Sequence, residues 1–306
     1  MNLKAAITGS SGLVGRALVP LLAAAGYDVV RLVRRPTTTQ DEVSFDPETG
    51  TIDRAALEGV DAVIHLAGES IAAGRWTAAR KARLRSSRVV PTRLLAETLA
   101  RMTTMPQVLV SASAIGFYGN RGEVSVSERD EPADDFLGRL SVDWETAAVA
   151  AEDAGIRVVY ARLGVVLTPA GGALGRMLMP FRLGLGGKLG PGTQFLSWIA
   201  MDDLMGVFLH LLHRSDIRGA VNVVAPRPVT NVEFTKTLGR VLDRPTLLGV
   251  PAFALRLALG EMADAALLAS TRVRPERLEA TGYRFRFPEL EGALQHCLGR
   301  TDPGQG

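Results

Sequence analysis

Cysteine is nearly absent from this sequence, because Cys297 is the only one among 306 residues. A single thiol excludes an intramolecular disulfide and a metal site built from several cysteines, which suits a reducing compartment. The chain also has no uninterrupted apolar run near the roughly 18 residues that a membrane span requires. Its first residues, MNLKAAITGS, lack the pattern of a secretory signal. We therefore expect a cytoplasmic protein without a membrane partner, in which Cys297 is a small apolar side chain of a C-terminal helix.

A large excess of charge of one sign is also lacking. The chain carries 35 basic and 32 acidic residues, so its formal net charge is only +3, and a nucleic-acid partner is not expected. The densest basic segment, residues 75–88, contains one large aromatic side chain, Trp76, whereas platforms that stack single-stranded bases need several. We interpret this segment as a solvated helical face. His210 and His213 lie three apart, but no cysteine or carboxylate pair nearby completes a ligand set, so we predict no metal.

Apolar segments rich in Val, Ile and Leu alternate with helical patterns along the first half of the chain. Strands that are apolar on both faces and separated by helices indicate a parallel sheet covered on both sides. The predicted strands are residues 3–8, 27–35, 61–68, 107–113 and 156–164, and the predicted helices are residues 13–26, around 86–103 and around 138–154. The sequence therefore predicts a doubly wound α/β domain.

The pattern changes after residue 167. The segment that follows places many glycines among apolar side chains, which is typical of irregular or mobile structure near a cleft. Regular alternation returns with a helix at 202–215 and a strand at 219–225, and a further helix begins near Thr230. We predict that residues 1–167 and 198–226 form the α/β domain, and that residues 168–197 and 227–306 form a smaller, discontinuous substrate-binding lobe.

The segment ITGSSGLVGRAL, residues 7–18, places Gly9, Gly12 and Gly15 three apart between the first predicted strand and the first predicted helix. Glycines let the backbone turn tightly and let a bulky anion approach it. The start of the helix directs free N–H groups and a positive dipole end toward that anion. The triplet alone is a weak signal, since a plain flexible turn also uses glycine. Its place in a βαβ unit of about 30 residues favours a dinucleotide pyrophosphate.

The end of the second predicted strand distinguishes between two nicotinamide cofactors. An NAD site typically has Asp or Glu there, which accepts a hydrogen bond from the ribose 2′-hydroxyl. This chain instead has RLVRRP, with Arg34 and Arg35 and no carboxylate. A pair of guanidinium groups can bind a 2′-phosphate through charge-assisted hydrogen bonds. NADP(H) is therefore the predicted cofactor, and a solvated strand end is the alternative interpretation of the two arginines.

Several further segments resemble the extended short-chain dehydrogenase/reductase superfamily. They are DAVIHLAGE at 61–69, SASAIGFYG at 111–119 and SERDEP at 127–132, together with the glycine turn. The segments RWTAARKARLRSSR, DDFLGRLSVDWE, GGALGRMLMPFRLGLGGKLGPGTQFLSWI and RPVTNVEFTKTLGRVLDRP are similar to an atypical subgroup, the sugar-nucleotide epimerase-like "epimerase family proteins". The resemblance spans nearly the whole chain, and it implies an NADP-binding Rossmann domain with a discontinuous C-terminal substrate lobe.

The resemblance also implies where cofactor and substrate bind. Arg88 falls near a position that contacts the cofactor, and Ser113 falls at the hydroxyl that polarises a substrate carbonyl. The other implied cofactor contacts are Gly9, Ser11, Gly12, Leu13 and Val14 along the pyrophosphate, Arg34 and Arg35 at the adenosine phosphate, and Leu66, Ala67 and Gly68 beside the ribose and nicotinamide.

One part of the superfamily's pattern is missing. The superfamily carries a Tyr-x-x-x-Lys motif, in which the lysine lowers the pKa of the tyrosine so that the phenol can exchange a proton while hydride moves. With Glu145 as the anchor of that helix, the tyrosine position is Leu137 and the lysine position is Ser141. Three explanations remain open. Another acid such as Tyr118 could serve, a conjugated or quinone-like acceptor could need little acid catalysis, or the protein could bind the cofactor without turnover.

We therefore predict an NADP(H)-binding oxidoreductase or epimerase-like enzyme that acts on a small polar or carbonyl substrate, with Ser113 orienting the substrate oxygen and Tyr118 a candidate proton donor. The alternative is a catalytically silent NADP(H)-responsive sensor or scaffold. A true nucleotide-sugar epimerase is disfavoured, because its reversible oxidation relies on the missing tyrosine and lysine. We interpret His65 as a packing and hydrogen-bonding residue. Helices with small apolar faces make a homodimer possible.

Overall fold

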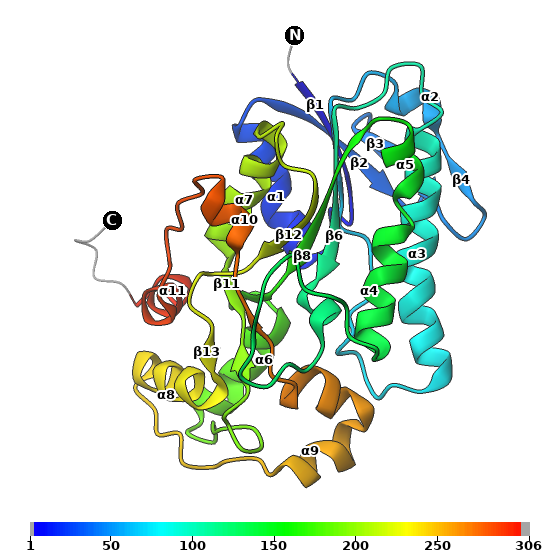
Figure 1. Ribbon diagram of the computed structural model, residues 1–306. Coiled ribbons are helices and arrows are strands. Elements are labelled where there is room, and N and C mark those ends of the chain that lie inside the picture. The colour runs from blue at the N-terminus through cyan, green and yellow to red at the C-terminus, as the bar shows by residue number, and fades with distance from the viewer. Residues whose placement is uncertain (1–2, 301–306) are drawn as a thin grey trace.

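The computed structural model describes residues 3–300, so the ends of the two predicted regions, residues 1–2 and 301–306, lie outside it. A central eight-stranded sheet organises the fold (Figure 1). Its strand order is β12-β8-β6-β5-β1-β2-β3-β4, and every neighbouring pair is parallel except β3 and β4. The strands are β1 (Leu3–Thr8), β2 (Tyr27–Val33), β3 (Glu42–Asp46), β4 (Thr51–Ile52), β5 (Ala62–His65), β6 (Val108–Ala114), β8 (Arg157–Leu163) and β12 (Gly219–Val223).

Helices cover both faces of this sheet, as Figure 1 shows. Two helices, α1 (Leu13–Ala24) and α7 (Met201–His213), lie on one face, and the apolar cluster between them and the sheet includes Ile7 and Phe208. On the other face lie α3 (Ala78–Leu99), α4 (Phe136–Thr146) and α5 (Val149–Asp153). The short α2 (Arg54–Leu57) and the 3-10 helix η1 (Ile115–Tyr118) complete the first half. The predicted doubly wound α/β fold is therefore confirmed.

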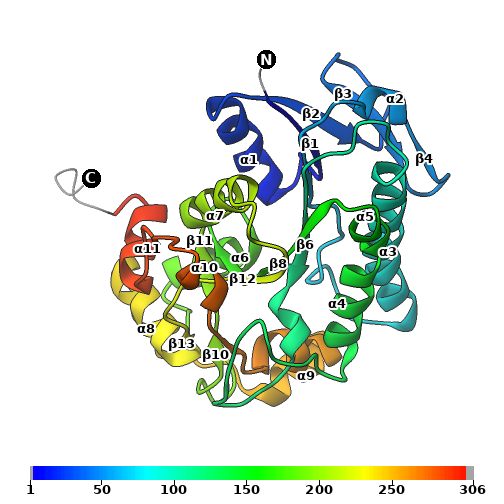
Figure 2. The same cartoon turned by 45° about the horizontal axis from the view of Figure 1, so that its top comes forward.

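Most of the remaining elements gather at the carboxyl ends of the strands (Figures 1 and 2), whereas α10 (Glu276–Ala280) packs beside β12 and the end of α7. Three small sheets pair β10 (Phe195–Leu196) with β13 (Val229–Thr230), β9 (Val165–Leu167) with β11 (Trp198–Ala200), and β7 (Ser125–Val126) with β14 (Arg272–Val273). The helices here are α6 (Gly172–Arg182), α8 (Asn231–Leu242), α9 (Ala252–Leu259) and α11 (Leu290–Cys297), with the π-helix η2 (Ala263–Leu268). Cys297 ends α11, the C-terminal helix in which it was predicted.

Packing crosses the predicted boundary between the two regions. Leu278, Tyr283 and Phe285 come from the C-terminal part of the chain but pack on the core beneath the main sheet. Trp198 belongs to the cluster around α6 and α8 instead, where it is fully buried. Its side chain is therefore part of the core. The division into two regions stays a proposal.

Two predicted helices differ from the observed ones, and two observed strands were not predicted. The helix expected around 86–103 begins at Ala78, because the side chain of Thr77 caps it by accepting from the N–H of Arg80. The helix expected at 138–154 is split, since the N–H of Ala148 turns back to the carbonyl of Glu145 and α5 starts separately. The short strands β3 and β4 were not expected. Among residues 3–300, no helix has the length and apolar character to cross a membrane.

Candidate dinucleotide-binding site

The glycine turn joins the end of β1 to the start of α1. Gly9 has a backbone φ of +68°, a left-handed conformation that glycine adopts without strain. A Cβ atom on Gly9 would lie 2.9 Å from the carbonyl carbon of Leu66, and one on Gly15 would lie 2.7 Å from the Cα of Ser10. Glycine at these two positions therefore lets the turn, the start of α1 and the end of β5 come close together.

The N-terminus of α1 is open toward this turn. Its N-cap is Gly12, no side chain caps it, and its first turn carries no acidic residue. Free N–H groups and the positive end of the helix dipole attract an anion at such a position. Ser11 and Gly12 are exposed, while Gly9, Leu13 and Val14 are partly exposed. The predicted pyrophosphate contacts thus form one accessible surface whose donors fit a diphosphate.

Leu66, Ala67 and Gly68 follow β5 directly beside the turn. The N–H groups of Leu66 and Ala67 donate to the hydroxyl oxygen of Thr8 over 3.1 and 3.2 Å. Gly68 is exposed, and its two neighbours are partly exposed. The structure therefore brings the residues predicted beside the ribose and nicotinamide next to the residues predicted at the pyrophosphate.

Arg34 and Arg35 follow β2 and are both exposed, but their surroundings differ. Arg35 binds the carboxylate of Glu42 through both terminal nitrogens, and one of these hydrogen bonds, Nη1 to Oε2, measures 2.9 Å. Arg34 has no hydrogen bond or ion pair with any residue in the described range 3–300. Its guanidinium group is therefore available to an added anion, whereas that of Arg35 already has an acidic partner.

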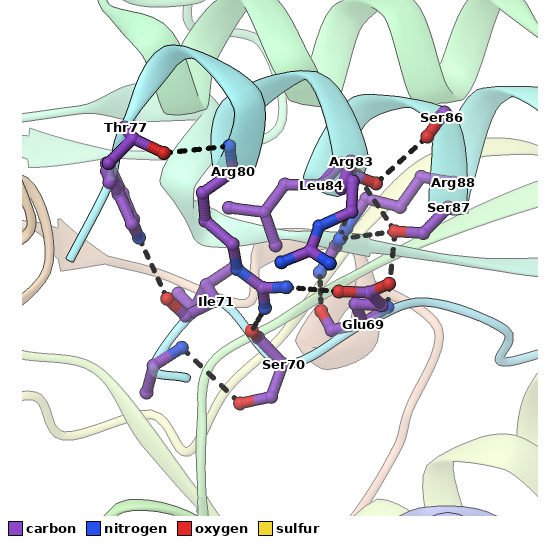
Figure 3. A network of polar contacts seen from close by, with 12 residues as sticks. Glu69, Ser70, Ile71, Thr77, Arg80, Arg83, Leu84, Ser86, Ser87 and Arg88 are labelled. Atoms are coloured by element: carbon purple, nitrogen blue, oxygen red, sulfur yellow. Dashed lines mark hydrogen bonds and ion pairs between the residues drawn. The ribbon is translucent and has the colours of Figure 1, made fainter. Parts of the chain in front are cut away.

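Arg88 lies beneath the loop that follows β5 (Figure 3). It is only 9% exposed, and its terminal nitrogens donate to the carbonyl oxygens of Glu69 and Leu84 over 2.8 and 3.0 Å. Burial lowers the pKa of this guanidinium group to about 10. A Cβ atom on Gly68 would lie 3.5 Å from the guanidinium carbon. Arg88 therefore supports the predicted cofactor surface from behind, and the interpretation as a solvated face is wrong for this residue.

Arg80 holds the same loop from about two helical turns earlier in α3. It is 8% exposed, forms an ion pair with Glu69 and donates to the carbonyl oxygen of Ser70 over 2.6 Å. Figure 3 shows both arginines reaching from α3 to the loop at Glu69 and Ser70. Two of the basic residues in 75–88 are therefore structural supports for the loop, which no pattern in their sequence distinguishes from the exposed ones.

Ser113 lies near the carboxyl end of β6, where its hydroxyl donates to Glu145 Oε1 over 2.6 Å. The same carboxylate accepts two hydrogen bonds of 2.8 Å from Arg162 on β8. Ser113 is 2% exposed. Glu145 entered the sequence argument only as an anchor of its helix, and Arg162 did not enter it. The hydroxyl proton of Ser113 is therefore donated to the Glu145 carboxylate. The lone pairs of the Ser113 oxygen can still accept a hydrogen bond from another group.

Tyr118 is fully buried at the end of η1. Its hydroxyl donates to Asn222 Oδ1 over 2.6 Å and accepts from Arg162 Nη1 over 2.9 Å. Burial raises the pKa of this phenol to about 12. These contacts give the hydroxyl two protein partners and no exposed surface, which argues against Tyr118 as the proton donor.

Leu137 and Ser141 occupy the two positions of the missing motif. The side chain of Leu137 packs against Gly116, where an added Cβ atom would lie 3.2 Å from the Leu137 Cβ. Ser141 is buried and donates to the carbonyl oxygen of Leu137 over 2.9 Å. Leu137 also joins an apolar cluster with Trp76, Leu140 and Met262. The position that corresponds to the superfamily's tyrosine is therefore part of an apolar surface.

The two histidines considered as metal ligands, and a lysine of the loop after α6, have local partners. His210 lies 3.0 Å from the hydroxyl of Thr281, and His213 lies 3.3 Å from that of Tyr27. Across residues 3–300, no three His, Cys, Asp or Glu side chains gather as a metal-binding group. Lys188 is exposed in the loop after α6, and its ammonium group donates to the carbonyl of Pro191 over 3.4 Å. None of these contacts connects to the glycine turn.

The sheet order, the open glycine turn and the contacts around it define a dinucleotide-binding protein of the Rossmann type. The profile of the "NAD dependent epimerase/dehydratase family" matches residues 5–224, and the chain belongs to this family, within the extended short-chain dehydrogenase/reductases. A domain of unknown function matches residues 250–297. The predicted family is thereby confirmed.

Relatives and solved structures cover nearly the whole chain. Epimerase family protein Mb2239 of Mycobacterium bovis is 44% identical over 303 residues, which are 99% of each chain. Epimerase family protein YfhF of Bacillus subtilis is 37% identical, with 96% of this chain and 97% of that one aligned. The crystal structure of human epimerase family protein SDR39U1 (isoform 2) with NADPH has a TM-score of 0.90 and 34% identity, and the match covers 98% of this chain and all of the human chain.

Proposed function

We propose that the protein is an NADP(H)-dependent oxidoreductase that acts on a small carbonyl-bearing substrate. The observation that carries this proposal is the open N-terminus of α1 against the glycine turn, with free Arg34 at the adjacent strand end. The human epimerase family protein SDR39U1, whose structure matches this chain with a TM-score of 0.90, was crystallised with NADPH. This similarity supports NADP(H) as the cofactor here.

The residues present fit this cofactor. The backbone of Gly9, Ser11, Gly12, Leu13 and Val14 would hold the diphosphate, Arg34 and Arg35 the 2′-phosphate, and Leu66, Ala67 and Gly68, supported by Arg88, the nicotinamide half. When bound, the nicotinamide supplies or accepts a hydride. Because the proton of Ser113 is directed at Glu145, its oxygen would orient the substrate by accepting a hydrogen bond from a hydroxyl or N–H group beside the carbonyl.

The choice of substrate follows from the proton donors. The hydroxyls of Ser113, Tyr118 and Ser141 each donate to a protein acceptor, and Leu137 carries no proton to give. General acid catalysis typically contributes about 10²–10⁴-fold to a rate, and a simple ketone would lose this factor. A conjugated acceptor such as a quinone or enone loses less, because its reduced form is stabilised as an anion that takes its proton from water. We therefore favour this class among the three explanations.

A specific observation also favours the second candidate function, a cofactor-binding sensor or scaffold. The hydroxyl protons of Ser113, Tyr118 and Ser141 are all donated to protein acceptors, so the site has no general acid. Ser113 is also only 2% exposed. Cofactor binding without turnover would follow if no acceptor reaches the site. Nucleotide-sugar epimerisation gains no support, since Leu137 and Ser141 replace the required pair. The cytoplasmic location and the homodimer stay predictions.

The test has two stages. Binding of NADPH is measured first by calorimetry, and the loss of reduced-nicotinamide absorbance is then followed with quinones, enones, simple aldehydes and nucleotide sugars. We expect turnover with conjugated acceptors, reduced by Ser113→Ala and unchanged in the matched control Ser141→Ala. Tight NADPH binding with no turnover across the panel would assign the sensor function. A chain that does not bind NADPH would refute both candidates.

A further inference from the structure

The buried side chain of His65 connects the cofactor turn to two helices on the opposite side of the sheet. His65 ends β5 and is 0% exposed. Its Nδ1 lies 2.8 Å from the hydroxyl oxygen of Thr8, the last residue of β1, and its Nε2 lies 2.9 Å from the hydroxyl oxygen of Thr92 on α3. Which ring nitrogen carries the proton decides the direction of both hydrogen bonds.

The surroundings of Thr92 settle the proton on Nε2. The indole Nε1–H of Trp144 is a donor only and lies 3.0 Å from Thr92 Oγ1, so Thr92 accepts there. The Thr92 hydroxyl lies 2.6 Å from the carbonyl oxygen of Arg88, which is an acceptor only, so Thr92 gives its single proton to Arg88. With that proton used, Thr92 can only accept from His65, and the Nε2 of His65 must be a donor.

The surroundings of Thr8 require the same arrangement. Thr8 Oγ1 accepts from the N–H groups of Leu66 and Ala67, which occupies both of its lone pairs. Its own proton is therefore free to be donated, and the acceptor is the unprotonated Nδ1 of His65. A doubly protonated His65 would present a third donor to an oxygen with two lone pairs. One hydrogen bond to the Leu66–Ala67 segment would then be lost.

We infer that neutral His65, protonated on Nε2, is a positioning residue for the cofactor site. It fixes the Thr8 hydroxyl, so that the oxygen lone pairs hold the amides of Leu66 and Ala67 beside Gly9. Through Thr92 it also fixes the carbonyl of Arg88, the residue behind Gly68. This inference rests on the proposed NADP(H) site, and it assigns His65 a role beyond packing: the acceptor at Nδ1 orders one side of the site and the donor at Nε2 orders the other.

Two substitutions separate these roles. The Oδ1 of asparagine lies near the position of a histidine Nδ1, so His65→Asn keeps an acceptor for Thr8. The Nε2 of glutamine lies near that of a histidine Nε2, so His65→Gln keeps a donor for Thr92. Both remove a buried ring, so a merely structural role would affect NADPH binding equally in the two variants. His210→Gln, whose parent side chain bonds to Thr281 away from the turn, is the control.

We expect His65→Gln to raise the Kd of NADPH about tenfold, the loss that one hydrogen bond can produce, and His65→Asn to raise it much less. The ¹⁵N spectrum of histidine-labelled protein, without cofactor, should show His65 as the Nε2–H tautomer at pH 7. Equal losses of affinity in the two variants, or an Nδ1–H signal, would overturn the inference. Failure of the wild-type chain to bind NADPH would refute the proposed function instead, because the spectrum tests the proton positions without cofactor.

Discussion

Glu42 holds Arg35 by two hydrogen bonds at the edge of the predicted adenosine site, and the carboxylate side chain is only 1% exposed. The hydrogen bond from Arg35 is the main cause that lowers the pKa of Glu42 to about 2, so the carboxylate is charged at neutral pH. Arg35 is thereby partly neutralised, whereas Arg34, its neighbour in sequence, is exposed and makes no hydrogen bond to a carboxylate, although its charge helps to lower the pKa of Asp46. The two arginines are therefore unequal as ligands for a phosphate.

Arg34→Ala should weaken NADPH binding more than Arg35→Ala does. Hydrogen bonds to charged groups are worth about 1.5–3 kcal/mol, so we expect the Kd of NADPH to rise roughly tenfold to a hundredfold in Arg34→Ala. The Kd of NADH, which has no 2′-phosphate, should change little in either variant. Calorimetry with both nucleotides measures the difference. A larger loss in Arg35→Ala, or equal losses for NADPH and NADH, would contradict the assignment.

The close approach of α1 to the glycine turn gives a second prediction. A Cβ atom on Gly15 would overlap the backbone of Gly9 and Ser10, and overpacking of a buried site costs about 1–3 kcal/mol. Gly15→Ala should therefore lower the free energy of unfolding by this amount and weaken NADPH binding, because the turn must move. Urea unfolding and NADPH titration measure the two effects.

Gly292→Ala is the matched control for this substitution. Gly292 lies in α11, and no atom lies within 4 Å of an added Cβ there. The variant should gain about 0.5–1 kcal/mol from the lower flexibility of its unfolded chain, with NADPH affinity unchanged. Similar destabilisation in Gly15→Ala and Gly292→Ala would show that the close contact at the turn has no energetic importance.

The features recognised in the sequence are those carried by neighbouring residues. The glycine turn lies within seven residues, Gly9 to Gly15, and the cap at Thr230 uses Glu233 three residues on, so both were visible in short segments. The contact between Ser113 and Glu145 spans 32 residues, and the one between Tyr118 and Asn222 spans 104. Such pairs arise only when the fold brings α4 against β6 and η1 against β12, and no local pattern encodes them.

Some missed elements lacked any local signal. Residues 146–151, TAAVAA, contain no helix-breaking residue, yet the helix ends at Thr146 and restarts at Val149. The strand β3 has the sequence EVSFD, in which an acidic residue at each end leaves too short an apolar pattern to predict a strand. The strand forms because it pairs in parallel with β2. Arg80 and Arg88 look like their exposed basic neighbours in sequence. Their burial follows from the loop after β5, which folds over them.

Removing the Tyr118 hydroxyl should change stability rather than activity. Tyr118→Phe leaves Asn222 Oδ1 and Arg162 Nη1 without this partner in a buried site, and an unsatisfied buried polar group costs about 1–3 kcal/mol. Tyr27→Phe is the control, because it removes only a 3.3 Å contact to His213. We expect the larger loss of unfolding free energy in Tyr118→Phe, with turnover retained. Abolished turnover with unchanged stability would restore Tyr118 as the proton donor.

The stability of the fold should depend on pH through His65. Burial lowers the pKa of this imidazole to about 4 from its ordinary value of 6.5. Between pH 6.5 and pH 4, His65 is protonated in the unfolded chain but neutral in the folded protein. The stability that neutral His65 contributes is therefore complete above pH 6.5 and is lost as the pH falls toward 4. The loss is about 3 kcal/mol at 1.36 kcal/mol for each pH unit. Asp41 and Glu42, whose hydrogen bonds to Arg31 and Arg35 lower their pKa to about 2, titrate below most of this range.

Urea unfolding at a series of pH values between 7.5 and 4 measures this contribution. In wild type the free energy of unfolding should fall across this range. His65→Asn, which has no titrating group at this position, should start from a lower value and show a flatter dependence, because the folded and unfolded chains then bind the same number of protons there. The control His210→Gln removes an imidazole whose pKa burial also lowers, but which is only partly buried, so it should flatten the curve less. An unchanged slope in His65→Asn would mean that His65 is not held neutral by its buried position between Thr8 and Thr92.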